Sequence, residues 1–222
     1  MKIIPQSINF SHDPPKNYLQ IVENAARLCY KSKKTNDVAA EKLVKNLIKK
    51  GHHSVLEHVT ISAILKTDRA TSHQIVRHRL ASYSQLSQRY VDHRGDIEFI
   101  LPINCNPIDF IPALKVAEKQ YEKLRAKNYS PEKARAVLPN ATATELVMTA
   151  NAREWRHIFD LRMSPKAQDN IRYLMMDFLI ACYQSMPILF EDIYFKKFSK
   201  GKECINQVAR KNKLQTKPRG HN

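Results

Sequence analysis

The sequence predicts an α+β fold in which helices pack around a small, mainly antiparallel sheet. Several segments repeat apolar residues every three or four positions, which is typical of one face of a helix. A few others alternate apolar and polar residues, as in a half-buried strand. The 222 residues hold only four glycines and show no internal repeat or long linker. We therefore expect one domain over residues 1–195, followed by a basic tail over 196–222.

The first half of the chain is predicted to form two strands and three helices. Capping residues, prolines and a terminal glycine set the helix boundaries. In chain order, the elements are a strand over 2–10, a helix opened by Asp13-Pro14-Pro15, a helix capped by Asp37 and ended by Gly51, a strand over 58–66, and a helix from Thr67 or Asp68 to about Val76.

The second half is predicted to begin with an irregular segment that reaches Tyr90, followed by alternating strands and helices. Proline marks the start of two helices and the end of another. The elements are a strand over 97–101, a helix over 109–127, a short helix opened by Ser130-Pro131-Glu132 that carries Arg135, a strand over 141–150, a helix over 151–162, and a helix opened by Ser164-Pro165 and stopped by Pro187.

The net charge is strongly positive, because 37 Lys and Arg oppose 21 Asp and Glu to give +16. Half of this excess lies in residues 196–222, which contain nine basic residues and one acid. Such a charge favours polyanionic partners, either nucleic acid or phosphate-bearing small molecules. The alternative for the tail is a solvated, frayed terminus.

Membrane insertion and secretion are not expected. Pro5 interrupts the N-terminal segment before an apolar signal region could form. The longest uncharged apolar stretch, residues 178–190, is shorter than the roughly 20 residues that a membrane span requires. The sequence therefore predicts a soluble, cytoplasmic protein.

The cysteines predict neither a disulfide framework nor a zinc site, since they lie far apart without a CxxC pair. None is expected to be a nucleophile: Cys29 and Cys182 fall on apolar helix faces, Cys105 lies in a proline-flanked loop, and Cys204 lies in the tail. The histidine-rich segment 51–58 misses the HExxH spacing, so no metal site is predicted.

The densest polar segment, residues 77–90, contains three arginines, one histidine and three serines but no acid. Guanidinium groups without acidic partners match phosphate or carboxylate, which they bind through two parallel hydrogen bonds. A solvated basic loop or an RNA-facing patch is the alternative. Leu80 and Leu86 favour a loop that is anchored inward.

A second polar group occupies the predicted helix over 151–162. Arg153, Arg156 and His157 share a face, and Arg162 lies at the helix end. In the alternative interpretation, Glu154 or Asp160 pairs locally with these arginines. No glycine-rich dinucleotide loop is present, so any flavin or nicotinamide site must be built from side chains.

The signature RHRxxSxxxxSxR, at Arg77, His78, Arg79, Ser82, Ser87 and Arg89, resembles that of the flavin-dependent thymidylate synthases, the ThyX family. The resemblance extends from about His52 to Arg172 through the segments HHSVLEH, PEKARAVLP and NAREWRHIFDLR. It implies a ThyX-like fold, a homotetramer with shared active sites, and reductive methylation of dUMP to dTMP. In that family, 5,10-methylenetetrahydrofolate supplies the carbon and NADPH reduces a bound FAD.

The resemblance also implies roles for individual residues. Arg162 is expected against the uracil ring, where its charge makes C5 more nucleophilic, and Ser87 is expected to donate a hydrogen bond to dUMP without acting as a nucleophile. The implied FAD contacts are Ser54, Arg77, His78, Arg79, Gln85, Asn151, Arg153 and His157. The implied dUMP contacts are Gln74, Arg77, Gln85, Leu86, Ser87, Gln88, Arg89, Arg135 and Arg162.

Three positions depart from the family pattern: Ser84 replaces a common Asn, Gln85 a common Glu, and Lys166 a common His. The neutral Gln85 is expected to weaken its contact with flavin or nucleotide. Two rival functions remain open. One is a nonenzymatic basic nucleic-acid-binding protein, and the other is a flavin enzyme that acts on a different substrate.

Overall fold

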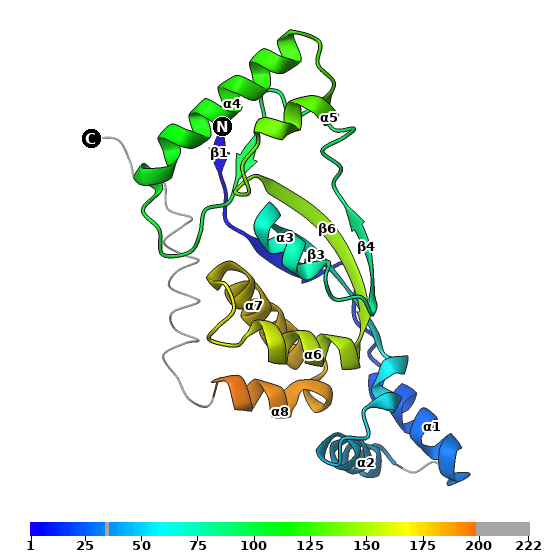
Figure 1. The fold of residues 1–222 in the computed structure, drawn as a ribbon. Coiled ribbons are helices and arrows are strands. Elements are labelled where there is room, and N and C mark those ends of the chain that lie inside the picture. Colours follow the sequence, from blue (N-terminus) through cyan, green and yellow to red (C-terminus); the bar gives the residue numbers. More distant parts are fainter. Residues whose placement is uncertain (34–35, 199–222) are drawn as a thin grey trace.

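The computed structural model describes residues 1–33 and 36–198. Its centre is a four-stranded sheet in the order β2-β3-β6-β4, in which every neighbouring pair is antiparallel (Figure 1). The strands are β2 (Ser7–Phe10), β3 (Thr60–Asp68), β6 (Ala143–Asn151) and β4 (Ala81–Gln85). β2 and β4 are therefore the two edges of this sheet.

Helices cover one face of the sheet and form the main core with it. α6 (Ala152–Arg162) and α7 (Asp169–Ser185) pack on the apolar side chains of β3 and β6, and α8 (Pro187–Phe198) packs on these helices. Trp155 is fully buried, with its ring centroid 4.7 Å from that of Phe178, and its indole N–H donates to the carbonyl of Ile61. This contact joins α6 to both α7 and β3.

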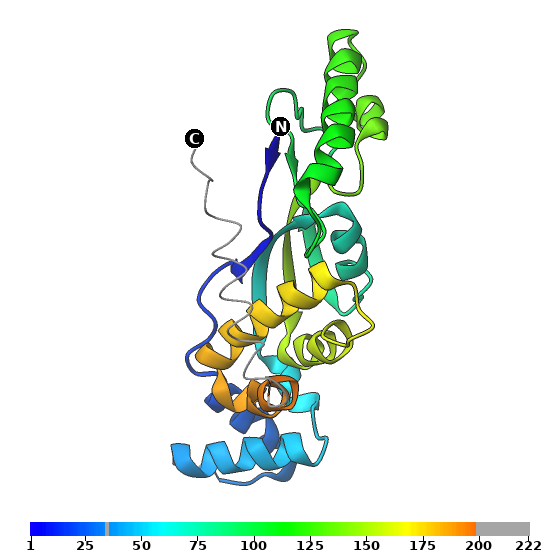
Figure 2. The same cartoon turned by 90° about the vertical axis from the view of Figure 1, so that its left-hand side faces the viewer.

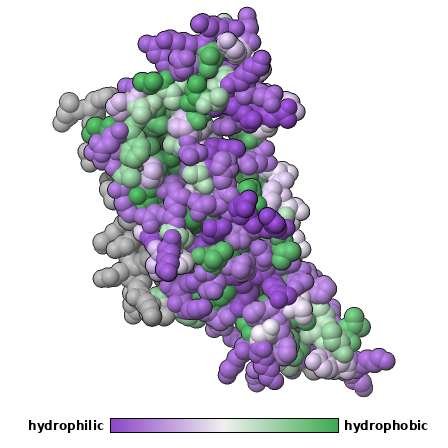
Figure 3. Space-filling view, viewed as in Figure 1, coloured by the Kyte–Doolittle hydropathy of each residue, from purple (hydrophilic) through white to green (hydrophobic). Residues whose placement is uncertain are grey.

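Two smaller groups of elements extend the molecule at opposite ends of the sheet (Figures 1 and 2). At one end, α4 (Pro107–Ala126), α5 (Pro131–Ala134) and the short helix η2 (Arg135–Val137) enclose a second core with the parallel pair β1 (Lys2–Ile3) and β5 (Glu98–Phe99). At the other lie α1 (Tyr18–Tyr30), α2 (Asp37–Lys49) and η1 (Ser54–His58). Hydrophilic residues cover most of the face in Figure 3, with apolar ones gathered over α4.

Most predicted elements are confirmed, and local chemistry explains them. Asp68 caps α3 (Arg69–Ile75), since its carboxylate accepts from the Thr71 amide at 2.8 Å and from the Thr71 hydroxyl at 2.7 Å. The predicted strands over 58–66 and 141–150 correspond to β3 and β6. The inward side chains predicted for the last helix are all buried in α7: Ile171, Met175, Phe178, Leu179 and Cys182.

Three predicted helix starts are wrong. α2 is capped by Asn36, which accepts from the Ala39 amide, and not by Asp37. α1 begins only at Tyr18 and α7 only at Asp169, each later than the proline segment predicted to open it.

Three further predictions about elements and their faces are also wrong. Pro5 divides the predicted strand over 2–10 into β1 and β2, which belong to different sheets. The segment predicted to be irregular contains β4. Pro187 does follow the end of α7, as predicted, and it also starts α8. Cys29 is exposed, because the last turn of α1 extends beyond the elements that cover its earlier turns.

Within residues 1–33 and 36–198, no helix combines the length and apolar character that a membrane span needs. The expectation of a basic tail concerns residues 196–222, of which 199–222 lie outside the described part of the chain.

Candidate active site

The signature segment runs along an edge of the sheet. β4 pairs with β6 from Ala81, opposite Ala150, to Gln85, opposite Leu146. Its five residues rise about 16 Å, at roughly 3.3 Å each. Residues 77–79 therefore lie beyond the N-terminal end of β4, next to α6, and residues 86–89 lie beyond its C-terminal end, towards α5.

At the N-terminal end of β4, a buried histidine joins the two arginine-rich segments. His78 is 6% exposed, and its Nε2 accepts a hydrogen bond of 2.9 Å from Nε of Arg162. Nη2 of Arg162 donates to the carbonyl of Gln74 at 3.1 Å. On the other side of the ring, Nδ1 of His78 lies 3.6 Å from Oε1 of Glu154. Burial and the neighbouring charges of Arg162 and His157 lower the pKa of His78 to about 4, so this ring is neutral at pH 7.

Tyr83 fixes the backbone that carries His78. Its hydroxyl lies 2.9 Å from the carbonyl oxygen of Ile75 and 2.7 Å from that of His78, to which it donates. Burial, with a smaller contribution from the charge of Glu154, raises the pKa of Tyr83 to about 12, so the phenol keeps its proton. The tyrosine is the inward anchor of the signature segment, whereas Leu80 is 74% exposed. Leu86 is 38% exposed, so the expectation that Leu80 and Leu86 anchor this loop inward is wrong.

Apart from Gln85, the remaining residues of the implied FAD set gather around the start of α6. Asn151 caps α6 by accepting from the Glu154 amide at 2.9 Å, and His157 lies one turn further along with its ring centroid 6.1 Å from that of His78. Arg153 forms an ion pair of 2.5 Å with Glu57 of η1, the helix that begins at Ser54. The structure thus brings the segment 54–58 next to α6.

At the C-terminal end of β4, two arginines from distant segments, Arg69 and Arg135, are close enough for their charges to interact. Arg69, in the first turn of α3, has its pKa lowered by burial and by the charge of Arg135. Neither side chain forms an ion pair with another residue of the described ranges. Arg89 lies on the same side and pairs with Glu132 of α5 at 2.9 Å. Two cations that repel one another without a carboxylate between them form a natural anion site.

Arg69 is a residue that the sequence patterns did not single out, although a signal for it exists. A cation in the first turn of a helix opposes the positive end of the helix dipole, and here it directly follows the N-cap Asp68. An arginine at such an unfavourable position indicates a role other than helix stability. His73, one turn later, lies 3.4 Å from Arg69 between Nε2 and Nη2.

The side chains of residues 85–88 line the same end of β4. Nε2 of Gln85 donates to the hydroxyl oxygens of Ser72 and Thr144, each at 3.1 Å, so this amide points towards the sheet interior. Gln88 is 9% exposed, and its buried Nε2 has no hydrogen-bond partner in the described residues. Ser87 accepts from the Arg89 amide at 3.2 Å. A buried donor without a partner fits an acceptor supplied by a ligand.

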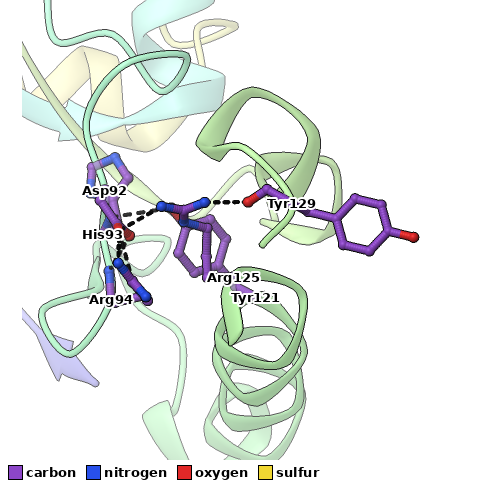
Figure 4. Close-up of polar contacts among 6 residues, drawn as sticks. All are labelled: Asp92, His93, Arg94, Tyr121, Arg125 and Tyr129. Carbon is purple, nitrogen blue, oxygen red and sulfur yellow. Dashed lines mark hydrogen bonds and ion pairs between the residues drawn. The ribbon is translucent and has the colours of Figure 1, made fainter. Parts of the chain in front are cut away.

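The loop that follows Arg89 is tied to α4 (Figure 4). Asp92 accepts from Nη2 of Arg125 at 2.8 Å and from Nε of Arg94 at 2.7 Å. These interactions, led by the hydrogen bond from Arg125, hold the pKa of Asp92 well below its usual range. The Tyr121 hydroxyl also accepts from the His93 amide at 3.2 Å. The position of the loop therefore depends on α4.

Local pairing within α6, the alternative interpretation of its charges, is wrong. Arg153 pairs with Glu57, and Arg156 makes a bidentate pair with Asp192 of α8, with both contacts at 2.7 Å. Asp160 pairs with Lys196 and Lys197, while Glu154 faces His78. Tertiary neighbours thus satisfy these charges, which leaves Arg162 directed at His78 and Gln74.

The described cysteines offer no activated thiol beside these arginines. Cys182 is fully buried, which raises the pKa of its thiol well above the usual value. Cys29 is exposed in the last turn of α1, and its thiol donates to the carbonyl of Ala25 at 3.5 Å. Cys105 is exposed just before α4, and Cys204 lies outside the described residues.

Comparison with known proteins decides the family. The family model described as "Thymidylate synthase complementing protein" matches residues 12–188. The chain is 39% identical over 183 residues to a flavin-dependent thymidylate synthase from Geobacter sulfurreducens, which covers 76% of this chain and 78% of the relative. This protein therefore belongs to the family of flavin-dependent thymidylate synthases. A second relative of the same name, from Mycolicibacterium gilvum, is 36% identical over 208 residues and covers 82% of each chain.

Solved structures support the fold assignment. The chain matches a UMP/dUMP methylase from Streptomyces cacaoi, solved with 5-Br dUMP, with a TM-score of 0.76 and 21% identity. The match covers 89% of this chain and 98% of that protein. The predicted ThyX-like α+β fold is therefore confirmed. The family does not favour a nonenzymatic nucleic-acid-binding protein.

Proposed function

We propose that this flavin-dependent thymidylate synthase methylates dUMP to dTMP with FAD as cofactor, NADPH as reductant and 5,10-methylenetetrahydrofolate as carbon donor. Beyond family membership, one observation carries the proposal. Arginines flank both ends of β4, the strand of the signature segment. Four of these arginines form no ion pair with any residue in the described ranges: Arg69, Arg77, Arg79 and Arg135. This donor set fits the phosphates of a nucleotide and of FAD.

FAD is assigned to the residues around the N-terminal end of β4 and the start of α6. We assign its contacts to Ser54, Arg77, His78, Arg79, Gln85, Asn151, Arg153 and His157. The exposed Arg77 and Arg79 suit the pyrophosphate, and the 54–58 segment lies beside Arg153 through the Glu57 ion pair. Once bound and reduced by NADPH, the flavin would supply the hydride that completes the methyl group.

The dUMP site is assigned around Arg162 and the C-terminal end of β4. Arg135 and Arg89 suit the phosphate, with Arg69 beside them, and Gln88 has an unpartnered buried donor. Further contacts are assigned to Gln74, Arg77, Gln85, Leu86, Ser87 and Arg162. Ser87 donates a hydrogen bond to dUMP, since no base is evident next to its hydroxyl among the described residues.

Arg162 is assigned against the uracil ring. Its Nε and Nη2 are bound by His78 and Gln74, which leaves Nη1 without a partner among the described residues. A fixed positive charge at the ring favours loss of the N3 proton and makes C5 more nucleophilic. The guanidinium is oriented before substrate binds, so little reorganisation is needed during the reaction.

The separation of the two ends of β4 supports active sites shared between subunits of a homotetramer. Arg77 and Arg89 are both assigned to dUMP, yet they flank a strand that rises about 16 Å. The implied FAD set is divided in the same way, because Gln85 lies at the opposite end of β4 from His78. Copies of the chain that meet along this edge would supply the two halves of each site.

The proposal is tested by spectroscopy and product analysis. The purified protein should show flavin absorbance, oxidise NADPH faster when dUMP is added, and form dTMP. Arg162→Ala should abolish methylation while the protein retains its flavin. The control Arg172→Ala, which removes an arginine paired with Asp169, should retain both methylation and bound flavin. A protein that remains colourless and inactive after reconstitution with FAD would refute the proposal. A product other than dTMP would favour a different flavin reductase.

A further inference from the structure

Glu154 is a buried acid in an unexpected orientation. The sequence Asn-x-x-Glu at the start of α6 matches a capping box, in which the glutamate carboxylate returns to the N-cap amide. Asn151 does accept from the Glu154 amide, but the Glu154 carboxylate lies beside His78. Glu154 is 7% exposed, and its carboxylate makes no hydrogen bond within the described residues. Burial raises its pKa, which the neighbouring His157 partly opposes.

The two nitrogens of His78 have different requirements. Nε of Arg162 carries a proton at any accessible pH and can only donate, so Nε2 of His78 must be the acceptor. The proton of the neutral ring then resides on Nδ1, which lies 3.6 Å from Oε1 of Glu154. This separation is longer than a hydrogen bond, so the contact is electrostatic. The negative charge of the carboxylate favours the tautomer that carries its proton on the nearby Nδ1.

The opposite tautomer conflicts with this arrangement. It would direct Nε2–H at the Arg162 Nε–H, and a protonated ring would place two positive charges 2.9 Å apart. The other groups around the ring are the cation Arg162, the imidazole of His157 and the protonated phenol of Tyr83. Among the described residues, Glu154 is the acid within 4 Å of a ring nitrogen of His78.

We propose that Glu154 is a positioning residue, which holds His78 in the Nδ1–H tautomer and thereby fixes the Arg162 guanidinium. Glu154 acts through His78, because its carboxylate is directed at Nδ1 while Arg162 binds Nε2 on the opposite side of the ring. The catalytic consequence rests on the proposed function, which places Arg162 against uracil. The structural consequence, which is the fixed His78 tautomer and Arg162 orientation, does not rest on the proposed function, since it concerns the substrate-free protein.

The direct test is nuclear magnetic resonance of protein labelled with ¹⁵N in histidine and arginine, with His78→Gln used to assign the His78 signals. In the wild type, Nδ1 should show the shift of a protonated nitrogen and Nε2 that of an unprotonated one. Glu154→Ala should give a mixture of tautomers and faster exchange of the Arg162 Nε–H. Glu154→Gln should retain the wild-type pattern, because its amide oxygen can face Nδ1–H.

Kinetics provide the second readout. In Glu154→Ala, kcat should fall about tenfold or more, as expected when a catalytic group is displaced, while the KM for dUMP changes much less. Glu154→Gln should recover most of kcat. If Glu154→Ala does not fold, Glu154→Met removes the acceptor at a similar side-chain length. Glu23→Gln removes another buried carboxylate, on α1, and should leave the His78 tautomer unchanged.

An unchanged tautomer and unchanged Arg162 exchange in both Glu154→Ala and Glu154→Met would overturn the proposal, even if either variant were less stable. The same holds if Glu23→Gln altered the His78 signals as much as Glu154→Ala. A wild-type protein without methylation activity would instead refute the proposed function. The tautomer measurement would still report on the role of Glu154.

Discussion

Acid should destabilise this protein through His78. The folded protein holds the pKa of His78 at about 4, whereas the unfolded chain has the ordinary value of 6.5. Between these values the unfolded state binds a proton that the folded state does not, so stability falls as the pH decreases from 6.5 to 4. The contribution of His78 is fully present above pH 6.5. Because each pKa unit corresponds to about 1.4 kcal/mol, the loss is at most about 3 kcal/mol.

The effect is isolated by comparison with His78→Gln. Glutamine does not titrate, and its amide oxygen can accept from Arg162 Nε. The free energy of unfolding is measured by urea denaturation at several pH values between 7 and 4, at one fixed protein concentration, because association also contributes to stability. The free energy of unfolding of the wild type minus that of the variant should decrease by about 2–3 kcal/mol as the pH falls from 7 to 4.

The difference also cancels the titration of other acids. Glu154 remains in both proteins, and its raised pKa acts in the opposite direction on acidification. A His12→Gln control removes an exposed histidine, which bonds to Ser11, and should follow the wild type. A wild-type minus His78→Gln difference that stays constant from pH 7 to 4 would refute this account of His78.

Three further predictions follow from contacts around the site. Asp192→Asn leaves Arg156, which is 6% exposed, without its carboxylate partner. The free energy of unfolding, measured by denaturation, should therefore fall by about 1–3 kcal/mol. An unchanged value would contradict the stabilising role of this ion pair. Arg125→Met removes the main partner of Asp92, which ties the loop after Arg89 to α4. The variant should therefore raise the KM for dUMP more than it lowers kcat. An equal effect on both constants would argue that Arg125 does not position this loop. Truncation after Phe198 should preserve flavin binding and dTMP formation. It should weaken any salt-sensitive binding to nucleic acid, which is measured by titration at two salt concentrations. Loss of bound flavin would show that the removed residues support the site.

The sequence predicted those elements whose determinants are local. The α3 cap depends on Asp68 and Thr71, which are three residues apart. The inward face of α7 follows from helical periodicity, which does not depend on what packs against it. The signature segment itself is a local pattern, and it is specific enough to predict the family, the cofactor and the reaction.

Other features could not be predicted because they depend on distant partners. The residues of β4 alternate only weakly in polarity, and the strand forms because β6 offers an open edge about 65 residues later. Cys29 follows the apolar spacing of α1, yet it is exposed because no element among residues 1–33 and 36–198 covers the end of that helix. The sequence does not distinguish Arg69 from other surface arginines, because its significance depends on the charge of Arg135 from another part of the chain.

The amino-acid sequence by itself determined the family, most of the helices and strands, and the types of side chain available for binding anions. Only the tertiary structure decided which of these side chains meet. Arg162 and His78 are 84 positions apart, and Glu154 faces His78 instead of capping its own helix. The physical reason is that periodicity and capping act within a few residues, whereas a buried charge is positioned by whichever groups the folded chain places around it.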